Sequence, residues 1–130
     1  MAVIKHPVLE RWDTPCSDIK CIFDIQLLHQ AQLGILKYSI VSNENIYDFR
    51  FERFGPYQVS DEQYLLDYWE VRDLYFPSIG NTFLVTNSEW HGELNEAYMP
   101  GAQHYVIATE NSCLEIITDT LPIITVTQLL

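Results

Sequence analysis

His104 is the first side chain in this sequence that could do acid–base chemistry, because imidazole titrates near neutral pH. It stands beside Tyr105 at the start of the apolar segment HYVIAT. Val106 and Ala108 share its face of a strand, which favours a satisfied histidine in the core or at its rim. No carboxylate or nucleophile nearby in the sequence completes a charge relay. A small enzyme or ligand-binding protein stays an alternative, and its pocket residues would be His104, Tyr105, Trp69 and Trp90.

Residues that bind metals are present, but their spacing does not match known metal sites. His91 lies two residues from both Glu89 and Glu93, so on a helix its side chain points away from theirs. Cys16 and Cys21 do not have zinc-site spacing, and no H-E-x-x-H or calcium-loop sequence occurs. The sequence therefore predicts no metal site.

Cofactor and nucleophile motifs are missing as well. Phosphate-binding loops need several glycines at fixed intervals before a helix, whereas the five glycines of this chain are scattered singly. No Gly-x-Ser-x-Gly sequence is present. We therefore predict no catalytic residue and no cofactor, and a non-enzymatic protein is favoured.

The charge distribution is more informative than any motif. The net charge is -11, and the segment from Asp73 to Leu130 contains seven acids but no lysine or arginine. Such a charge repels phosphate and anionic lipid, so we expect neither nucleic acid nor a membrane as a partner. It favours a basic protein partner, since complementary potentials speed encounter. The alternative is that the acids only keep the protein in solution.

Alternation of apolar and polar residues predicts most of the strands. Residues 19–29, 33–41 and 47–54 alternate in this way and predict an antiparallel meander. In the first of these segments the apolar side is expected to comprise Ile19, Cys21, Phe23, Ile25 and Leu27. Residues 81–87 predict a short buried strand. Residues 104–109 and 112–118 predict a hairpin that turns at Glu110 and Asn111.

The last predicted strand, residues 123–130, follows Pro122. A proline at the start of a strand is typical of the edge of a sheet, because it cannot donate to a neighbouring strand. We therefore expect this segment to be an edge strand.

Two segments have helical periodicity. Ser60 and Gln63 form a capping-box pattern before YLLDYWEVRDLYF, which predicts a helix there. Its buried stripe would be Tyr64, Leu65, Tyr68, Val71 and Tyr75. Asn87 or Ser88 is the expected N-cap of a second helix over SEWHGELNEAY. The acids on the outer faces of the two helices are the candidate partner-binding residues Asp67, Glu70, Asp73, Glu89, Glu93 and Glu96.

Together these patterns predict one α+β domain over residues 1–130. It would contain an antiparallel sheet of about six strands with two amphipathic helices packed on it, in the order β-β-β-α-β-α-β-β-β. Three cysteines, an odd number, do not support a disulfide framework. No signal-like or 18-residue apolar segment occurs, so we expect a cytoplasmic protein.

The order of three segments resembles small acidic bacterial domains of the uncharacterised and toxin-immunity kind. These segments are FRFERFG, FLVTNSEW and HYVIATENSCLEIITDTLPI, within residues 34–126. The resemblance implies a cytoplasmic inhibitor that binds a basic cognate toxin and carries no catalytic residues. A third alternative is a structural homo-oligomeric accessory protein that pairs through the strand near Pro122.

Overall fold

The computed structural model describes residues 6–61, 66–92 and 99–129. These ranges contain strands and two helices in the following order: β1 (Leu9–Arg11), β2 (Phe23–Gln30), β3 (Ile35–Val41), β4 (Asn45–Phe51), β5 (Tyr57–Asp61), α1 (Leu66–Tyr75), β6 (Thr82–Val85), α2 (Glu89–Gly92), β7 (Gln103–Ala108), β8 (Ser112–Thr118) and β9 (Ile123–Gln128). The structure is thus mostly β.

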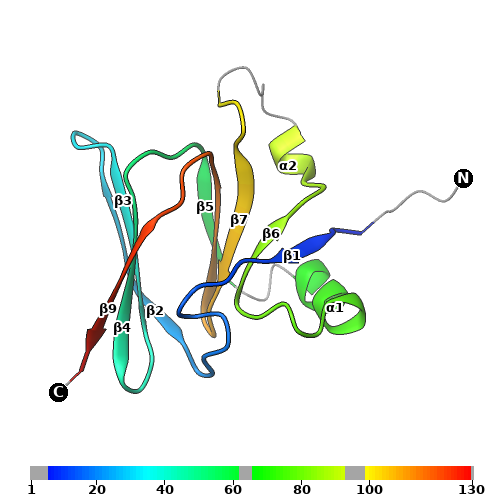
Figure 1. Cartoon of the computed structure of the whole chain (residues 1–130), viewed down its shortest axis with the longest axis horizontal. Coiled ribbons are helices and arrows are strands. Elements are labelled where there is room, and N and C mark those ends of the chain that lie inside the picture. The colour runs from blue at the N-terminus through cyan, green and yellow to red at the C-terminus, as the bar shows by residue number, and fades with distance from the viewer. Residues whose placement is uncertain (1–5, 62–65, 93–98, 130) are drawn as a thin grey trace, which may run out of the picture.

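The strands form two antiparallel sheets that pack face to face (Figure 1). The five-stranded sheet has the order β1-β6-β7-β8-β5, and the four-stranded sheet has the order β2-β3-β4-β9. Helix α1 packs on the side of the five-stranded sheet that faces away from the four-stranded sheet. The layers are therefore sheet, sheet and one helix.

The main core lies between the two sheets and follows from the period of two along each strand. In β4, Phe49 and Phe51 are fully buried while the intervening Arg50 is exposed. In β8, Leu114 and Ile116 face the same core from the opposite sheet. The alternating segments thus direct their large apolar side chains into one layer.

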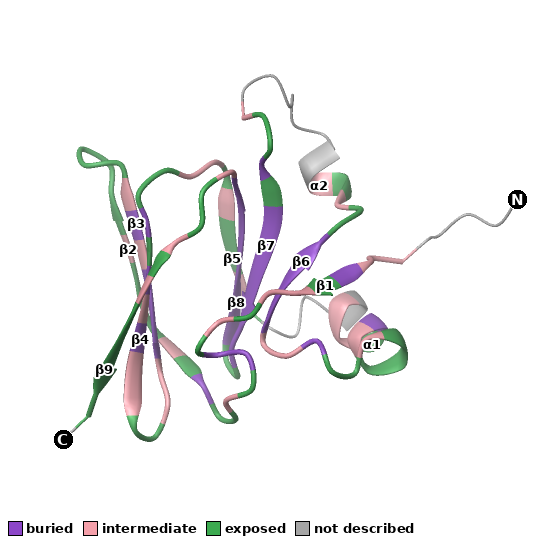
Figure 2. Ribbon diagram, in the orientation of Figure 1, coloured by how far each residue is buried: buried purple, intermediate pink, exposed green. Residues whose placement is uncertain are grey.

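The middle strands of the five-stranded sheet are buried on both faces (Figure 2). Their second face contributes Phe83, Val106 and Cys113 to a smaller cluster beneath α1, which adds Val71. Side chains that alternate toward α1 are therefore enclosed as well. His104 is one of them.

The expected α+β architecture is wrong. The chain has two packed sheets, and among the described residues only α1 is long enough to cover a face of a sheet, since four described residues form α2. Residues 93–98 of the second expected helix lie outside the described residues. Two strands, β1 and β5, were not predicted: β1 pairs with β6, and β5 pairs with β8. Both are short, so their pairing partners rather than a local pattern hold them extended.

The capping-box interpretation of Ser60 is also wrong. Ser60 lies within β5 and pairs with Cys113 of β8, so its backbone is extended where a helix start was expected. Gln63, the other residue of the pattern, lies outside the described residues, as do Tyr64 and Leu65 of the expected stripe. Here pairing with a buried strand outweighs a local capping signal.

The rest of the expected stripe on α1 is only partly correct. Val71 is buried and Tyr68 is half-buried, but Tyr75 is exposed. Tyr75 is the last residue of the helix, and its ring stacks on His6 with centroids 4.6 Å apart. The end of α1 therefore presents apolar surface instead of burying it.

The meander and the hairpin are confirmed, as is the edge position of the last strand. The expected apolar side of the first strand is wrong, because Phe23, Ile25 and Leu27 are exposed and the neighbouring Ile22 is buried instead. Ile19 and Cys21 lie before β2, which begins at Phe23 and has a register shift between Asp24 and Gln26.

Candidate functional site

A buried carboxylate and imidazole meet between the five-stranded sheet and α1. His104 of β7 and Glu115 of β8 are each 2% exposed. Nε2 of His104 lies 2.9 Å from Oε1 of Glu115. Both face the helix side because the hairpin register pairs His104 with Ile117 and Val106 with Glu115. They are therefore diagonal neighbours on one face.

Glu115 receives two further hydrogen bonds. The Tyr68 hydroxyl donates to its Oε1 at 2.7 Å, and Nε2 of Gln58 donates to its Oε2 at 2.8 Å. Burial alone raises the pKa of the Glu115 carboxyl, but the hydrogen bonds from His104, Tyr68 and Gln58 outweigh it and hold the pKa below its ordinary value. The carboxylate thus links β5, α1 and β7 to its own strand.

The other ring nitrogen of His104 is occupied as well. Nδ1 lies 2.7 Å from Oγ of Ser88, and the ring makes an edge contact with Trp90 at 5.2 Å between centroids. Ser88, His104 and Glu115 therefore form a hydroxyl–imidazole–carboxylate chain, which is the composition of a charge relay. Because the imidazole and the carboxylate are buried, we interpret these three side chains as a structural network in which each buried polar group has its partner.

This network makes stability depend on pH in a defined direction. A carboxyl whose pKa is lower in the folded protein stabilises it above the unfolded-state pKa of about 4.3, and this contribution is lost as the pH falls through the folded-state pKa. We expect the unfolding free energy to drop between about pH 5 and pH 3, by at most about 1.4 kcal/mol per pH unit from this group. Urea titrations of the wild type and Glu115→Gln across this window measure the difference. Parallel pH profiles for the two proteins would refute the assignment.

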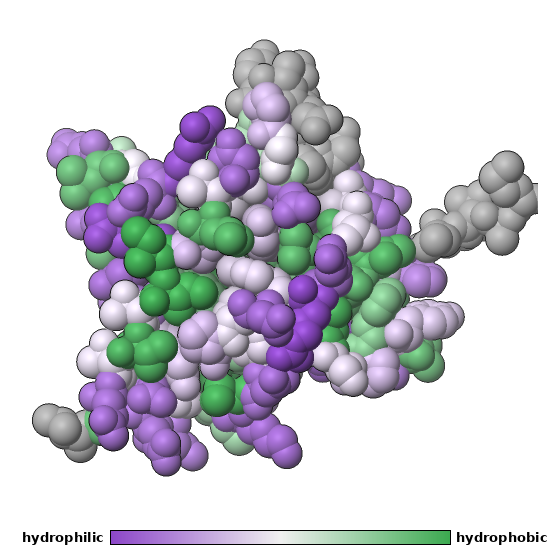
Figure 3. All heavy atoms as spheres, in the orientation of Figure 1, coloured by the Kyte–Doolittle hydropathy of each residue, from purple (hydrophilic) through white to green (hydrophobic). Residues whose placement is uncertain are grey.

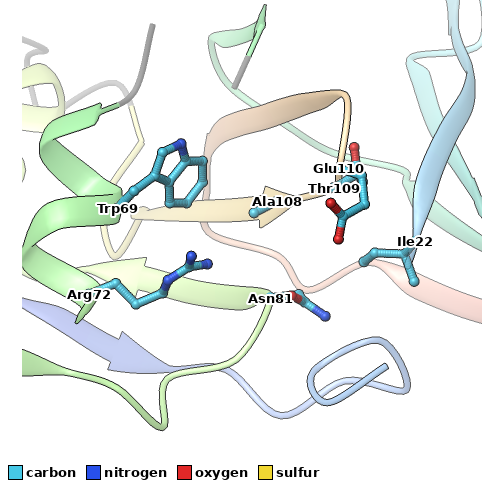
Figure 4. A pocket seen from close by; sticks show the side chains of 7 residues that line it. All are labelled: Ile22, Trp69, Arg72, Asn81, Ala108, Thr109 and Glu110. Atoms are coloured by element: carbon cyan, nitrogen blue, oxygen red, sulfur yellow. The ribbon is translucent and has the colours of Figure 1, made fainter. Parts of the chain in front are cut away.

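A pocket of about 260 Å³ opens on the surface between α1, the β7–β8 turn and the segment that precedes β2 (Figure 4). Trp69 and Arg72 line it from α1, and the Glu110 carboxylate points into it from the opposite side. The Arg72 guanidinium lies 4.9 Å from the centre of the Trp69 ring. This hollow suits a polar or charged side chain better than an apolar ligand. Its full lining is Ile22, Trp69, Arg72, Asn81, Ala108, Thr109 and Glu110.

The four residues proposed for a Tyr/Trp/His104 pocket do not line one common pocket. Trp90 contacts His104, whereas Trp69 lines the surface pocket. Tyr105 is on the opposite face of β7, in the core between the sheets, where its ring contacts Trp12 at 4.9 Å. Adjacent strand residues point to opposite faces, which is why His104 and Tyr105 are separated.

The candidate partner-binding acids are only partly described. Glu70, Asp73 and Glu89 are exposed. The side chain of Asp67 and the whole of Glu93 and Glu96 lie outside the described residues.

The segment from Asp73 to Leu130 contains no lysine or arginine, but some of its acids pair with arginines that precede it in the sequence. Asp119 lies 3.4 Å from Arg53, and Asp73 lies 3.6 Å from the adjacent Arg72. Glu115 is buried against His104 and contributes nothing to the outer surface. Glu89 and Glu110 remain exposed.

The chain matches no protein-family model, no curated protein and no solved structure. Within residues 6–61, 66–92 and 99–129, no cluster of three or more histidines, cysteines or acids is close enough to hold a metal ion. In that same part of the chain, no helix is long and apolar enough to cross a membrane.

Proposed function

We propose that this chain is a non-enzymatic protein-binding domain that docks on a basic protein through the exposed side of α1, as an immunity-type inhibitor does with a basic toxin. The observation that carries the proposal is the surface at the end of α1. Leu74 is 65% exposed and lies one helical turn after the exposed Glu70 and next to the exposed Asp73, and Tyr75, which ends the helix, is 59% exposed. We call these four residues the α1 surface.

The α1 surface combines the two components of a protein contact. Large apolar side chains supply area that a partner can bury, and the surrounding acids orient the partner. Aromatic residues such as tyrosine are enriched among the residues that dominate binding energy. Stacking on His6 holds the Tyr75 ring in place, with 7° between the ring planes. A ring that is ordered before binding loses less entropy when a partner covers it.

Electrostatics support a basic partner. The net charge of -11 attracts a positively charged protein from a distance. The nearest base on the helix, Arg72, packs over Trp69 and pairs with Asp73, so its charge is partly offset. The surface pocket shares Trp69 and Arg72 with this helix, and Glu110 offers a carboxylate there to a basic side chain of the partner.

The proposed location is the cytoplasm. Cys16, Cys21 and Cys113 are free thiols, and Cys16 and Cys113 are buried. Unpaired cysteines are typical of proteins in a reducing compartment. This location fits an inhibitor that meets its toxin inside the cell that makes both.

The proposal predicts a charge-dependent complex. Among basic proteins encoded in neighbouring genes, we expect the one that binds the wild type to bind the double variant Glu70→Lys/Asp73→Lys at least about tenfold more weakly. Isothermal titration calorimetry at low and moderate salt measures the effect. The wild-type affinity should fall as salt is raised.

The matched control is Glu44→Lys/Glu52→Lys, which changes the net charge equally but at the two ends of β4, in the four-stranded sheet. Both control acids are exposed. Equal weakening by the two double variants would mean that only net charge matters, and unchanged binding by the α1 variant would contradict the proposal.

A further inference from the structure

Strand β9 has an open edge. It pairs with β4 on one side and ends the order of its sheet. Within residues 6–61, 66–92 and 99–129, no strand pairs with its other side. A row of backbone N–H and C=O groups is therefore available there to another strand.

Apart from Pro122, which directly precedes the strand, this edge lacks the features that usually prevent strand pairing. Residues 120–130 contain no ionisable side chain, and the β4–β9 register runs without a bulge. Figure 3 shows hydrophobic side chains over the path of β9, where Ile123 is 54% exposed and Val126 is 47% exposed. Leu121 and Leu129 extend the exposed apolar strip at its two ends. Long, uncharged, apolar edges are those that pair with another chain.

The other sheet edges are protected. Strand β2 carries a bulge and the charged Asp24, β1 has three residues that include Glu10 and Arg11, and β5 ends at Asp61. Short strands, bulges and charges are the usual devices against edge pairing. The absence of all three from β9 therefore distinguishes it.

We propose that β9 pairs in antiparallel fashion with β9 of a second copy, about a two-fold axis at Thr125. The two four-stranded sheets then become one continuous sheet. The interface is isologous, as in most homodimers. It goes beyond the proposed binding of a basic partner and does not depend on it, because β9 and α1 lie in different outer layers of the fold (Figure 1).

The sequence of β9 is self-complementary in this register. Ile124 lies opposite Val126 of the second copy, so β-branched apolar side chains pair twice on one face. On the other face Thr125 meets its own copy, and Ile123 meets Thr127. Cross-strand pairs of β-branched residues and of threonines stabilise antiparallel sheets.

The net charge of -11 does not prevent a second copy from pairing at this edge. The contact strip itself is neutral, so no acid is buried. Arg50, which lies opposite Ile123, already pairs with Glu52 of its own copy at 3.6 Å. The two-fold axis places Arg50 about three strand spacings or ~14 Å from β4 of the other copy, beyond the screening length of about 8 Å at physiological salt. Charge pairs therefore contribute little across the interface, whose stability is expected to come from backbone hydrogen bonds and apolar contact.

Thr125→Lys tests the register. The substitution places two lysines opposite each other at the axis, whereas in the single copy the lysine lies across from Asp48 and suits the fold. We expect sedimentation equilibrium to show a dimer for the wild type and a dissociation constant raised at least about tenfold for Thr125→Lys. The control Gln26→Lys, at an exposed site on β2, should leave the dimer unchanged.

Thr125→Cys in a Cys21→Ser background provides a second test. Cys21 is the exposed thiol, so the new cysteine becomes the accessible one. Under mild oxidation we expect a disulfide-linked dimer that keeps the wild-type circular dichroism. A wild type that stays monomeric over a wide dilution series overturns the proposal, as does a dimer that Thr125→Lys leaves intact.

Discussion

Replacing Glu115 with leucine is expected to lower the free energy of unfolding by about 3–5 kcal/mol. The substitution leaves the His104 ring and the Tyr68 hydroxyl without the acceptor that both use. Each buried donor that loses its partner costs about 1–3 kcal/mol. Gln58 is exposed and can turn to water, so it adds little. Urea denaturation followed by tryptophan fluorescence measures the change.

Two variants serve as references for Glu115→Leu. Glu115→Gln retains an acceptor oxygen and should cost less. Glu110→Gln, an exposed acid in the turn of the same hairpin, should stay within about 0.5 kcal/mol of the wild type. If Glu115→Leu matched Glu110→Gln in stability, the buried network would not hold the helix and the strands together as described.

Phe49→Ala is expected to destabilise the protein by about 3–5 kcal/mol. The Phe49 side chain is fully buried between the two sheets and makes an edge contact with Trp12 at 5.9 Å between ring centroids. Its removal leaves a cavity in the layer that joins the sheets. The midpoint of urea denaturation should fall accordingly.

Phe23→Ala is the matched control for the core substitution, since it removes the same ring from an exposed position on β2. We expect it to cost less than about 1 kcal/mol. Similar losses for Phe49→Ala and Phe23→Ala would argue against face-to-face packing of the two sheets.

The elements that could be predicted from the sequence are those with a local pattern. Alternation in β3 and β4 places Tyr38 and Phe49 in the core, and the turn at Glu110 sets the β7–β8 hairpin. Pro122 correctly indicates an edge strand. Each of these features depends on neighbours in the chain, so a short window contains the necessary information.

The division into two sheets could not be predicted in this way. The pairing of β1 with β6 joins Leu9 to Val85, and that of β5 with β8 joins Ser60 to Cys113. Neither β1 nor β5 alternates between apolar and polar residues for long enough to indicate a strand, and Ser60 also fits a helix-capping pattern. Long-range burial decided both cases.

The buried network was missed for a related reason. In the sequence Glu115 is only one of the seven acids between Asp73 and Leu130, yet the hairpin register places it on one face with His104. The register of the hairpin alone is therefore enough to predict that His104 and Glu115 are neighbours. Ser88 has no comparable signal, because its position depends on how α2 folds back toward His104.

The most direct test of the proposed function is the footprint of the basic partner on this chain. Amide chemical shifts of the labelled chain, recorded with and without the unlabelled partner, report which residues the partner contacts. We predict that the largest changes fall on α1, at Glu70, Asp73, Leu74 and Tyr75. A footprint confined to the outer face of the four-stranded sheet, with α1 unchanged, would contradict it.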